Sequence, residues 1–253
     1  MLLTRFLALL SRWRPVFQQE RSFHRAVRQA AGALLVVGSA RLTRILAGLG
    51  RDQQDWSADY TLHARAEWEQ QSLLDALLPS ARAHCPGRFV PVALDDTRLR
   101  KTGQRIPTAF WQRDPLSPPF RMNLPWGLRF LQASLLLPLH RKHNVNARAI
   151  PVRFVAAPSL KKPKAQADAQ AQERYREQRK QHNLSRQAVG LLIDLRQSLD
   201  QAGVSHKPLL VAGDGSFCNR ALFRTPLERI ELLCRPRADV RLCAPAPAGS
   251  RRT

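Results

Sequence analysis

The sequence predicts an α+β protein in which an N-terminal helical domain precedes a mixed β-sheet with flanking helices. In residues 1–84, apolar side chains recur at spacings of three and four, which is typical of amphipathic helices. After the turn at residues 85–87, the pattern changes to short strand-like runs, with one long helical tract between the third run and the fourth. A chain of 253 residues with 44% hydrophobic content is long enough to bury a core.

The helical domain contains a short segment, residues 39–50, that is flanked by helix start and stop signals. Ser39 is predicted as the N-cap and Gly50 as the stop, and another helix precedes them. Two interpretations stay open for this pair of helices. It is either a helix-turn-helix with Arg41 and Arg44 at a DNA groove, or an ordinary helical hairpin with solvated arginines.

The second domain, residues 85–243, predicts three strands, a helix, a strand, a helix and a strand. A polar, proline-rich excursion over residues 101–125 follows the first strand. The long helical tract is polar in its first half and apolar in its second, so the second half should pack on the sheet. The strands are expected at 88–96, 126–137, 149–156, 208–214 and 229–235, the helices at 165–202 and 219–224, and a disordered tail at 244–253.

The charge balance indicates a polyanionic partner. Lys and Arg number 41 against 19 Asp and Glu, which gives a net charge of +22. Such an excess repels itself unless a polyanion shares the surface, and double-stranded DNA is the expected partner. The alternative is a ribosome-associated or merely basic protein. An RNA-binding module has less support, because the sequence lacks an aromatic RNP pattern, a KH-type glycine loop and a zinc knuckle.

The compartment is expected to be the cytoplasm, in association with the nucleoid. Four widely spaced cysteines indicate reduced thiols and neither a disulfide framework nor a zinc site. The apolar N-terminus is interrupted by arginine and lacks a clear cleavage site, so an amphipathic helix explains it better than a signal peptide. No apolar run approaches the roughly 20 residues that a membrane-spanning helix needs, so no membrane partner is expected.

Two aspartates, Asp96 and Asp214, are the predicted catalytic and metal-binding residues. Each follows a buried apolar run, which places its carboxylate at the edge of the sheet. Paired carboxylates in such a place can hold Mg²⁺ or Mn²⁺ against a phosphate. Asp95 and Asp96 point to opposite faces of a strand, so only one of them can face the site. The alternative for Asp214 is a simple strand-ending turn.

A basic loop after the second strand carries His140, Lys142 and His143. We expect Lys142 to contact DNA, since phosphate positioning explains this loop better than surface decoration. The scattered histidines do not imply a metal cage.

Together these segments resemble the DDE-type transposases of bacterial insertion sequences. The resemblance rests on residues 94–97, on 113–130 and on 211–219. It implies a ribonuclease H-like core behind a helical DNA-binding domain, with Asp96 and Asp214 as the first two catalytic acids and Mg²⁺ or Mn²⁺ as cofactor. The implied partners are transposon ends, target DNA, and a second copy or full-length transposase.

The third acid of that family is a glutamate on a later helix. Glu228 and Glu231 lie too early in the chain to match it. The resemblance therefore implies an incomplete core, a truncated transposase that is inactive alone. The alternative function is a non-catalytic DNA-binding remnant or inhibitor that occupies transposon ends.

Overall fold

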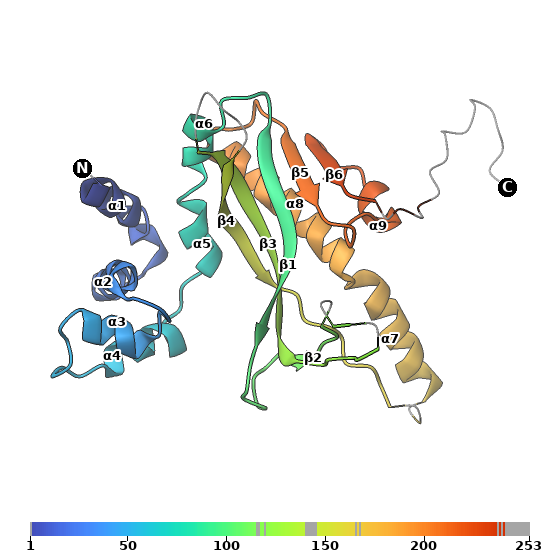
Figure 1. The fold of residues 1–253 in the computed structure, drawn as a ribbon, viewed down its shortest axis with the longest axis horizontal. Coiled ribbons are helices and arrows are strands. Elements are labelled where there is room, and N and C mark those ends of the chain that lie inside the picture. The colour runs from blue at the N-terminus through green and yellow to red at the C-terminus, as the bar shows by residue number, and fades with distance from the viewer. Residues whose placement is uncertain are drawn as a thin grey trace. The chain divides into compact units, whose positions relative to one another are not determined.

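The structure is a computed structural model that describes residues 2–114, 117–118, 120–139, 146–164, 166, 168–236, 238 and 240. The chain forms two compact units, Met1–Ala83 and His84–Thr253 (Figure 1). The first unit is helical, and the second combines helices with a mixed sheet, so the predicted α+β class is confirmed. The tail predicted at 244–253 lies outside the described residues.

The helical unit is built from short helices around a few buried leucines and aromatic rings. Gly32 in α2 (Glu20–Leu35) packs closely against α3 (Leu42–Gly48) and its C-cap, since an added Cβ would lie 2.7 Å from Cδ1 of Leu49 and 2.8 Å from Cγ2 of Ile45. The helices are α1 (Leu2–Ser11), the 3₁₀ helix η1 (Arg14–Val16), α2 (Glu20–Leu35), α3 (Leu42–Gly48), α4 (Ser57–Ala64), α5 (Gln70–Asp75) and α6 (Pro79–His84).

The predicted start of α3 is wrong by two residues, whereas its glycine stop is present. The N-cap is Arg41, without a side-chain cap, and Ser39 instead accepts a backbone hydrogen bond from Arg41 at 2.8 Å. Gly50 has a φ of 67° and follows the last turn, as a C-terminal glycine in the left-handed region does.

A buried polar network joins α2 to α4. Asp59 is 1% exposed and accepts hydrogen bonds from Nη2 of Arg28 at 2.9 Å and from Nε2 of Gln29 at 3.1 Å. Oε1 of Gln29 in turn lies 2.7 Å from Nε2 of His63. Burial raises the pKa of Asp59, but the hydrogen bonds from Gln29 and Arg28 outweigh it, so the carboxyl pKa is below its usual value.

The α+β unit contains a six-stranded mixed sheet among its described residues. The strand order is β4-β3-β1-β5-β6, and β2 pairs with the outer part of β3. Strand β3 is antiparallel to β1 and to β4, whereas β1, β5 and β6 are parallel to one another. The strands are β1 (Val90–Arg100), β2 (Phe110–Trp111), β3 (Trp126–Pro138), β4 (Ala147–Ala156), β5 (Leu209–Gly213) and β6 (Ile230–Cys234).

One face of the sheet packs against α8 (Leu184–Gln201), which runs behind the strands in Figure 1. Alternate residues of β1 and β5 point to this face because side chains alternate along a strand. The buried residues of this layer are Val90, Val92, Leu94, Leu131, Ala133, Leu135, Leu209 and Val211 from the sheet and Ala188, Leu191, Leu192, Leu195 and Leu199 from α8.

The single helix predicted for residues 165–202 is wrong, since the tract forms two helices. Helix α7 (Ala169–Gln181) ends before His182, and α8 begins after Asn183. Oδ1 of Asn183 accepts a hydrogen bond from the backbone N–H of Arg186 at 2.9 Å, so this side chain caps the new helix. The short helix predicted after β5 is present as α9 (Arg220–Phe223).

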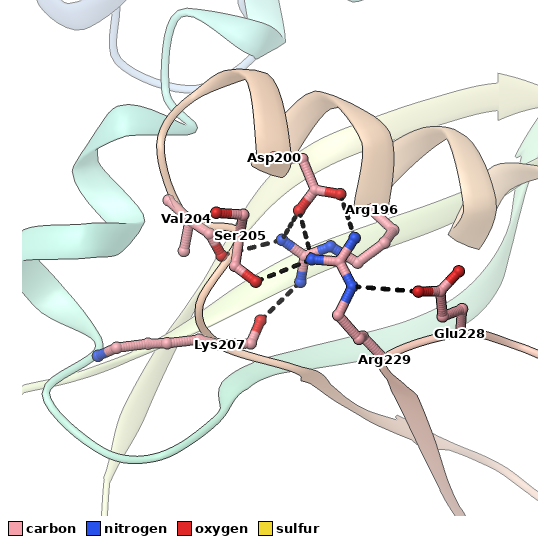
Figure 2. A network of polar contacts seen from close by, with 7 residues as sticks. All are labelled: Arg196, Asp200, Val204, Ser205, Lys207, Glu228 and Arg229. Atoms are coloured by element: carbon pink, nitrogen blue, oxygen red, sulfur yellow. Dashed lines mark hydrogen bonds and ion pairs between the residues drawn. The ribbon is translucent and has the colours of Figure 1, made fainter.

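A polar network fastens the end of α8 to the start of β6 (Figure 2). Arg196 is 4% exposed and donates to Oδ1 of Asp200 at 2.8 Å and to the carbonyls of Val204 and Lys207 at 3.0 and 2.7 Å. Arg229 donates to both oxygens of Asp200. The network therefore links the end of α8 to the segment that leads into β5 and to the residue that precedes β6.

Candidate functional site

The adjacent aspartates of β1 point to opposite faces of the sheet, as alternation requires. Asp96 shares its face with the buried Leu94 and has a side chain that is only 12% exposed. Asp95 is exposed, and its Oδ1 accepts a hydrogen bond from the backbone N–H of Asp96 at 2.8 Å. The Asp96 carboxylate is therefore largely buried, whereas the Asp95 carboxylate is exposed to solvent.

The strands that carry Asp96 and Asp214 are parallel neighbours, as predicted. The last pair of their ladder is Leu94 with Gly213. Asp95 and Asp96 follow Leu94, and Asp214 follows Gly213, so the aspartates leave this ladder at one end of the sheet. Strand β1 itself continues along β3 to Arg100, so the strand does not end at Asp96 as expected.

Asp96 is held by arginines from two strands. Nε and Nη2 of Arg129 both lie 2.7 Å from Oδ2 of Asp96, and Nη2 of Arg98 lies 3.7 Å from the same oxygen. Arg98 and Arg129 are cross-strand partners between β1 and β3, so both reach the same face as Asp96. Oδ1 of Asp96 has no hydrogen-bond partner among the described residues.

Asp214 lies in a turn that is anchored at both ends. Its Oδ1 accepts hydrogen bonds from the backbone N–H of Ser216 at 3.0 Å and from the Ser216 hydroxyl at 2.6 Å. Phe217 is 1% exposed, and Nδ2 of Asn219 donates to Oγ of Ser185 in α8 at 2.9 Å. Oδ2 of Asp214 has no hydrogen-bond partner in the part of the chain that the structure describes.

Each carboxylate thus has one oxygen held in place and one oxygen open. Carboxylate oxygens are ligands that Mg²⁺ and Mn²⁺ favour. Within the described ranges, no three His, Cys, Asp or Glu side chains gather closely enough to hold a metal ion. Mg²⁺ keeps several of its waters and needs only one or two carboxylates from a protein.

The predicted DNA-binding residues fall into two groups. Arg41 and Arg44 are exposed at the start of α3. Positive charge at a helix N-terminus opposes the helix dipole, so helix stability does not explain this pair. Lys142, with His140 and His143, lies outside the described residues.

Sequence reasoning missed Arg98 and Arg129 as members of the site. A signal was present for Arg129, because a charged residue within an apolar strand run needs a partner. The partner is Asp96, 33 positions away in the chain. Only the register between β1 and β3 identifies it, and the apolar pattern alone does not fix that register.

The cysteines that the structure describes, Cys85, Cys218 and Cys234, are free thiols. Burial raises the pKa of the Cys85 thiol and of the Cys234 thiol. A raised pKa disfavours the thiolate, so Cys85 and Cys234 are poor nucleophiles.

No family model, no curated protein and no solved structure matches the chain. Among the described residues, no helix has the length and apolar content needed to cross a membrane.

Proposed function

We propose that this chain is a DNA-binding protein whose α+β unit binds a divalent metal at Asp96 and Asp214. More specifically, we propose an insertion-sequence transposase with a ribonuclease H-like core. The observation that carries the proposal is the parallel pairing of β1 with β5, which brings the aspartates to one end of the sheet. The order of strands and helices in the unit supports it, because it follows the order expected from the resemblance apart from the added strand β2 and the division of the long helix into α7 and α8.

The roles of the residues follow from their contacts. Arg129 fixes Oδ2 of Asp96, and Ser216 fixes Oδ1 of Asp214, so each open oxygen has a defined place. When bound, a divalent ion would stabilise negative charge on the attacking and leaving oxygens of a phosphodiester. The positive charge of Arg129 and Arg98 beside Asp96 also favours approach of a phosphate.

The helical unit supplies the proposed DNA-binding surface. Arg41 and Arg44 are exposed at one end of α3, and α2 packs against the same helix. Positive charge there interacts unfavourably with the helix dipole but attracts a polyanion such as DNA. We therefore propose that α3 contacts the DNA backbone.

A titration with Mn²⁺ tests the metal site. We expect the wild-type protein to bind Mn²⁺ and Asp214→Asn to lose at least about tenfold in affinity, because an amide oxygen replaces a charged ligand. Asp194→Asn is the matched control, since Asp194 is exposed on α8 and its side chain has no partner among the described residues. Isothermal titration measures both variants. Equal affinities in Asp214→Asn and Asp194→Asn would remove the metal from the proposal.

A second function is favoured by the contact between Asp96 and Arg129. A carboxylate already neutralised by a guanidinium gains less from a metal, and among the described residues no three His, Cys, Asp or Glu side chains gather to hold one. These features suit a non-catalytic DNA-binding protein that occupies transposon ends. It would bind DNA as the first proposal requires, but with the same affinity in the presence and absence of divalent ions.

A further inference from the structure

We infer that a cavity beside Arg129 is a phosphate-binding pocket. The cavity has a volume of about 270 Å³. It lies where α7 meets α8, next to the strand that carries Arg129. Its lining includes Arg129, Tyr175, Arg179, His182, Asn183 and Gln187. The inference rests on the proposed function only in naming DNA as the source of the phosphate.

The lining is cationic. Arg129 and Arg179 each contribute a guanidinium, His182 contributes an imidazole, and the lining contains no Asp or Glu among the described residues. The side chains of Arg179 and His182 have no hydrogen bond or ion pair with any described residue. Guanidinium groups present planar pairs of donors that match phosphate oxygens. An anion therefore fills this cavity better than a neutral or cationic ligand.

The helix ends at the cavity do not use up these cations. The exposed carbonyls at the end of α7 are satisfied by amide side chains: Nδ2 of Asn183 donates to Lys180 at 3.0 Å, and Nε2 of Gln187 donates to His182 at 2.9 Å. The first turn of α8 points its N–H groups towards this end and adds partial positive charge. Because the amide side chains bond these carbonyls, Arg179 and His182 stay available to a ligand.

Arg129 connects the pocket with the proposed metal site. Its Nε and Nη2 bind Asp96, whereas its Nη1 has no partner in the described part of the chain. The third nitrogen is therefore free for a phosphate in the cavity. A DNA strand whose phosphate enters the pocket would contact Arg129, and Arg129 contacts Asp96.

Binding of a fluorescent DNA duplex to the full chain tests the pocket, with each variant first checked for folding by circular dichroism. We expect Arg179→Gln to weaken binding about five- to tenfold at 0.1 M salt and to reduce the slope of log K against log salt by about 0.9. His182→Gln should weaken it to a smaller extent. The control is Arg174→Gln, which removes the same charge from the same helix outside the cavity and should change binding less than twofold.

A second arm separates the pocket from the proposed function. Inorganic phosphate is titrated while NMR follows the side-chain signals of Arg179 and His182. If the wild type binds DNA and Arg179→Gln weakens it no more than Arg174→Gln, the pocket inference fails and the DNA-binding proposal stands. If DNA does not bind but phosphate shifts both signals, the pocket holds and takes free phosphate. If neither ligand binds, both ideas are overturned.

Discussion

The affinity of the protein for duplex DNA should fall by about a thousandfold between 50 and 200 mM salt. The net charge of +22 allows many phosphate contacts, and six to ten contacts produce a loss of roughly 10³ to 10⁵ over this range through counterion release. Fluorescence anisotropy with a labelled duplex, repeated at several salt concentrations, gives the slope.

The same experiment tests the role of α3. Replacing Arg41 and Arg44 by glutamine should flatten the slope by about 0.9 for each lost phosphate contact. Arg5 is also an exposed arginine of the helical unit and serves as the matched control. Binding that is absent at 50 mM salt would contradict the proposed partner. A slope that Arg5→Gln and the α3 variants reduce equally would contradict the role of α3 alone.

Asp200→Asn should destabilise the α+β unit by about 3 kcal/mol. The substitution leaves the buried guanidinium of Arg196 without its counter-charge, and breaking such a pair typically costs about 3–5 kcal/mol. We place the effect at the lower end because the Asp200 side chain is 27% exposed. Thermal unfolding should show a melting temperature lower by roughly 6–12 °C. Asp194→Asn, on the same helix, should leave it unchanged.

The effect of Asp200→Asn should depend on pH. Hydrogen bonds from Arg229, joined by Arg196, hold the pKa of Asp200 below its usual value. A depressed carboxyl pKa contributes stability that is present at neutral pH and is lost as the pH falls below about 4. The two proteins should therefore differ most at pH 7 and converge in acid. A difference that stays constant down to pH 2 would show that charge at Asp200 is not the cause.

The strands were predictable because their apolar runs are long and bounded by turns. The strand predicted at 126–137 is observed at Trp126–Pro138, and the one at 149–156 is observed at Ala147–Ala156. Strand β2 has only two residues, Phe110 and Trp111, which is too short to show a hydrophobic periodicity in the sequence.

The helical tract was misread because both halves have helical composition. The break depends on Asn183, whose side chain caps α8, and a single Asn is a weak signal inside a polar tract. The break matters for function, since the cavity with Arg179 and His182 lies at that junction. No pattern along the chain indicates a cavity between two helices and a strand.

The candidate site was predictable as far as the strand ends and no further. Each apolar run ends at an aspartate, so Asp96 and Asp214 could be named and their strands paired. The ion pair of Asp96 with Arg129 depends on the register of two antiparallel strands, and a shift of one residue would move Arg129 to the other face. The contact of Asp96 with Arg129 is therefore determined by the pairing of the strands, and composition and spacing do not predict it.

Iron-directed cleavage of the polypeptide tests the metal site most directly. Fe²⁺ takes the place of Mg²⁺ and, with ascorbate and peroxide, generates radicals that cut the backbone next to the bound ion. We predict two cuts in the same reaction, one near Asp95 and Asp96 and one near Asp214, both suppressed by excess Mg²⁺ and absent in Asp214→Asn. Cleavage at only one of these strand ends, or cleavage that Mg²⁺ does not suppress, would contradict a shared metal site at the ends of β1 and β5.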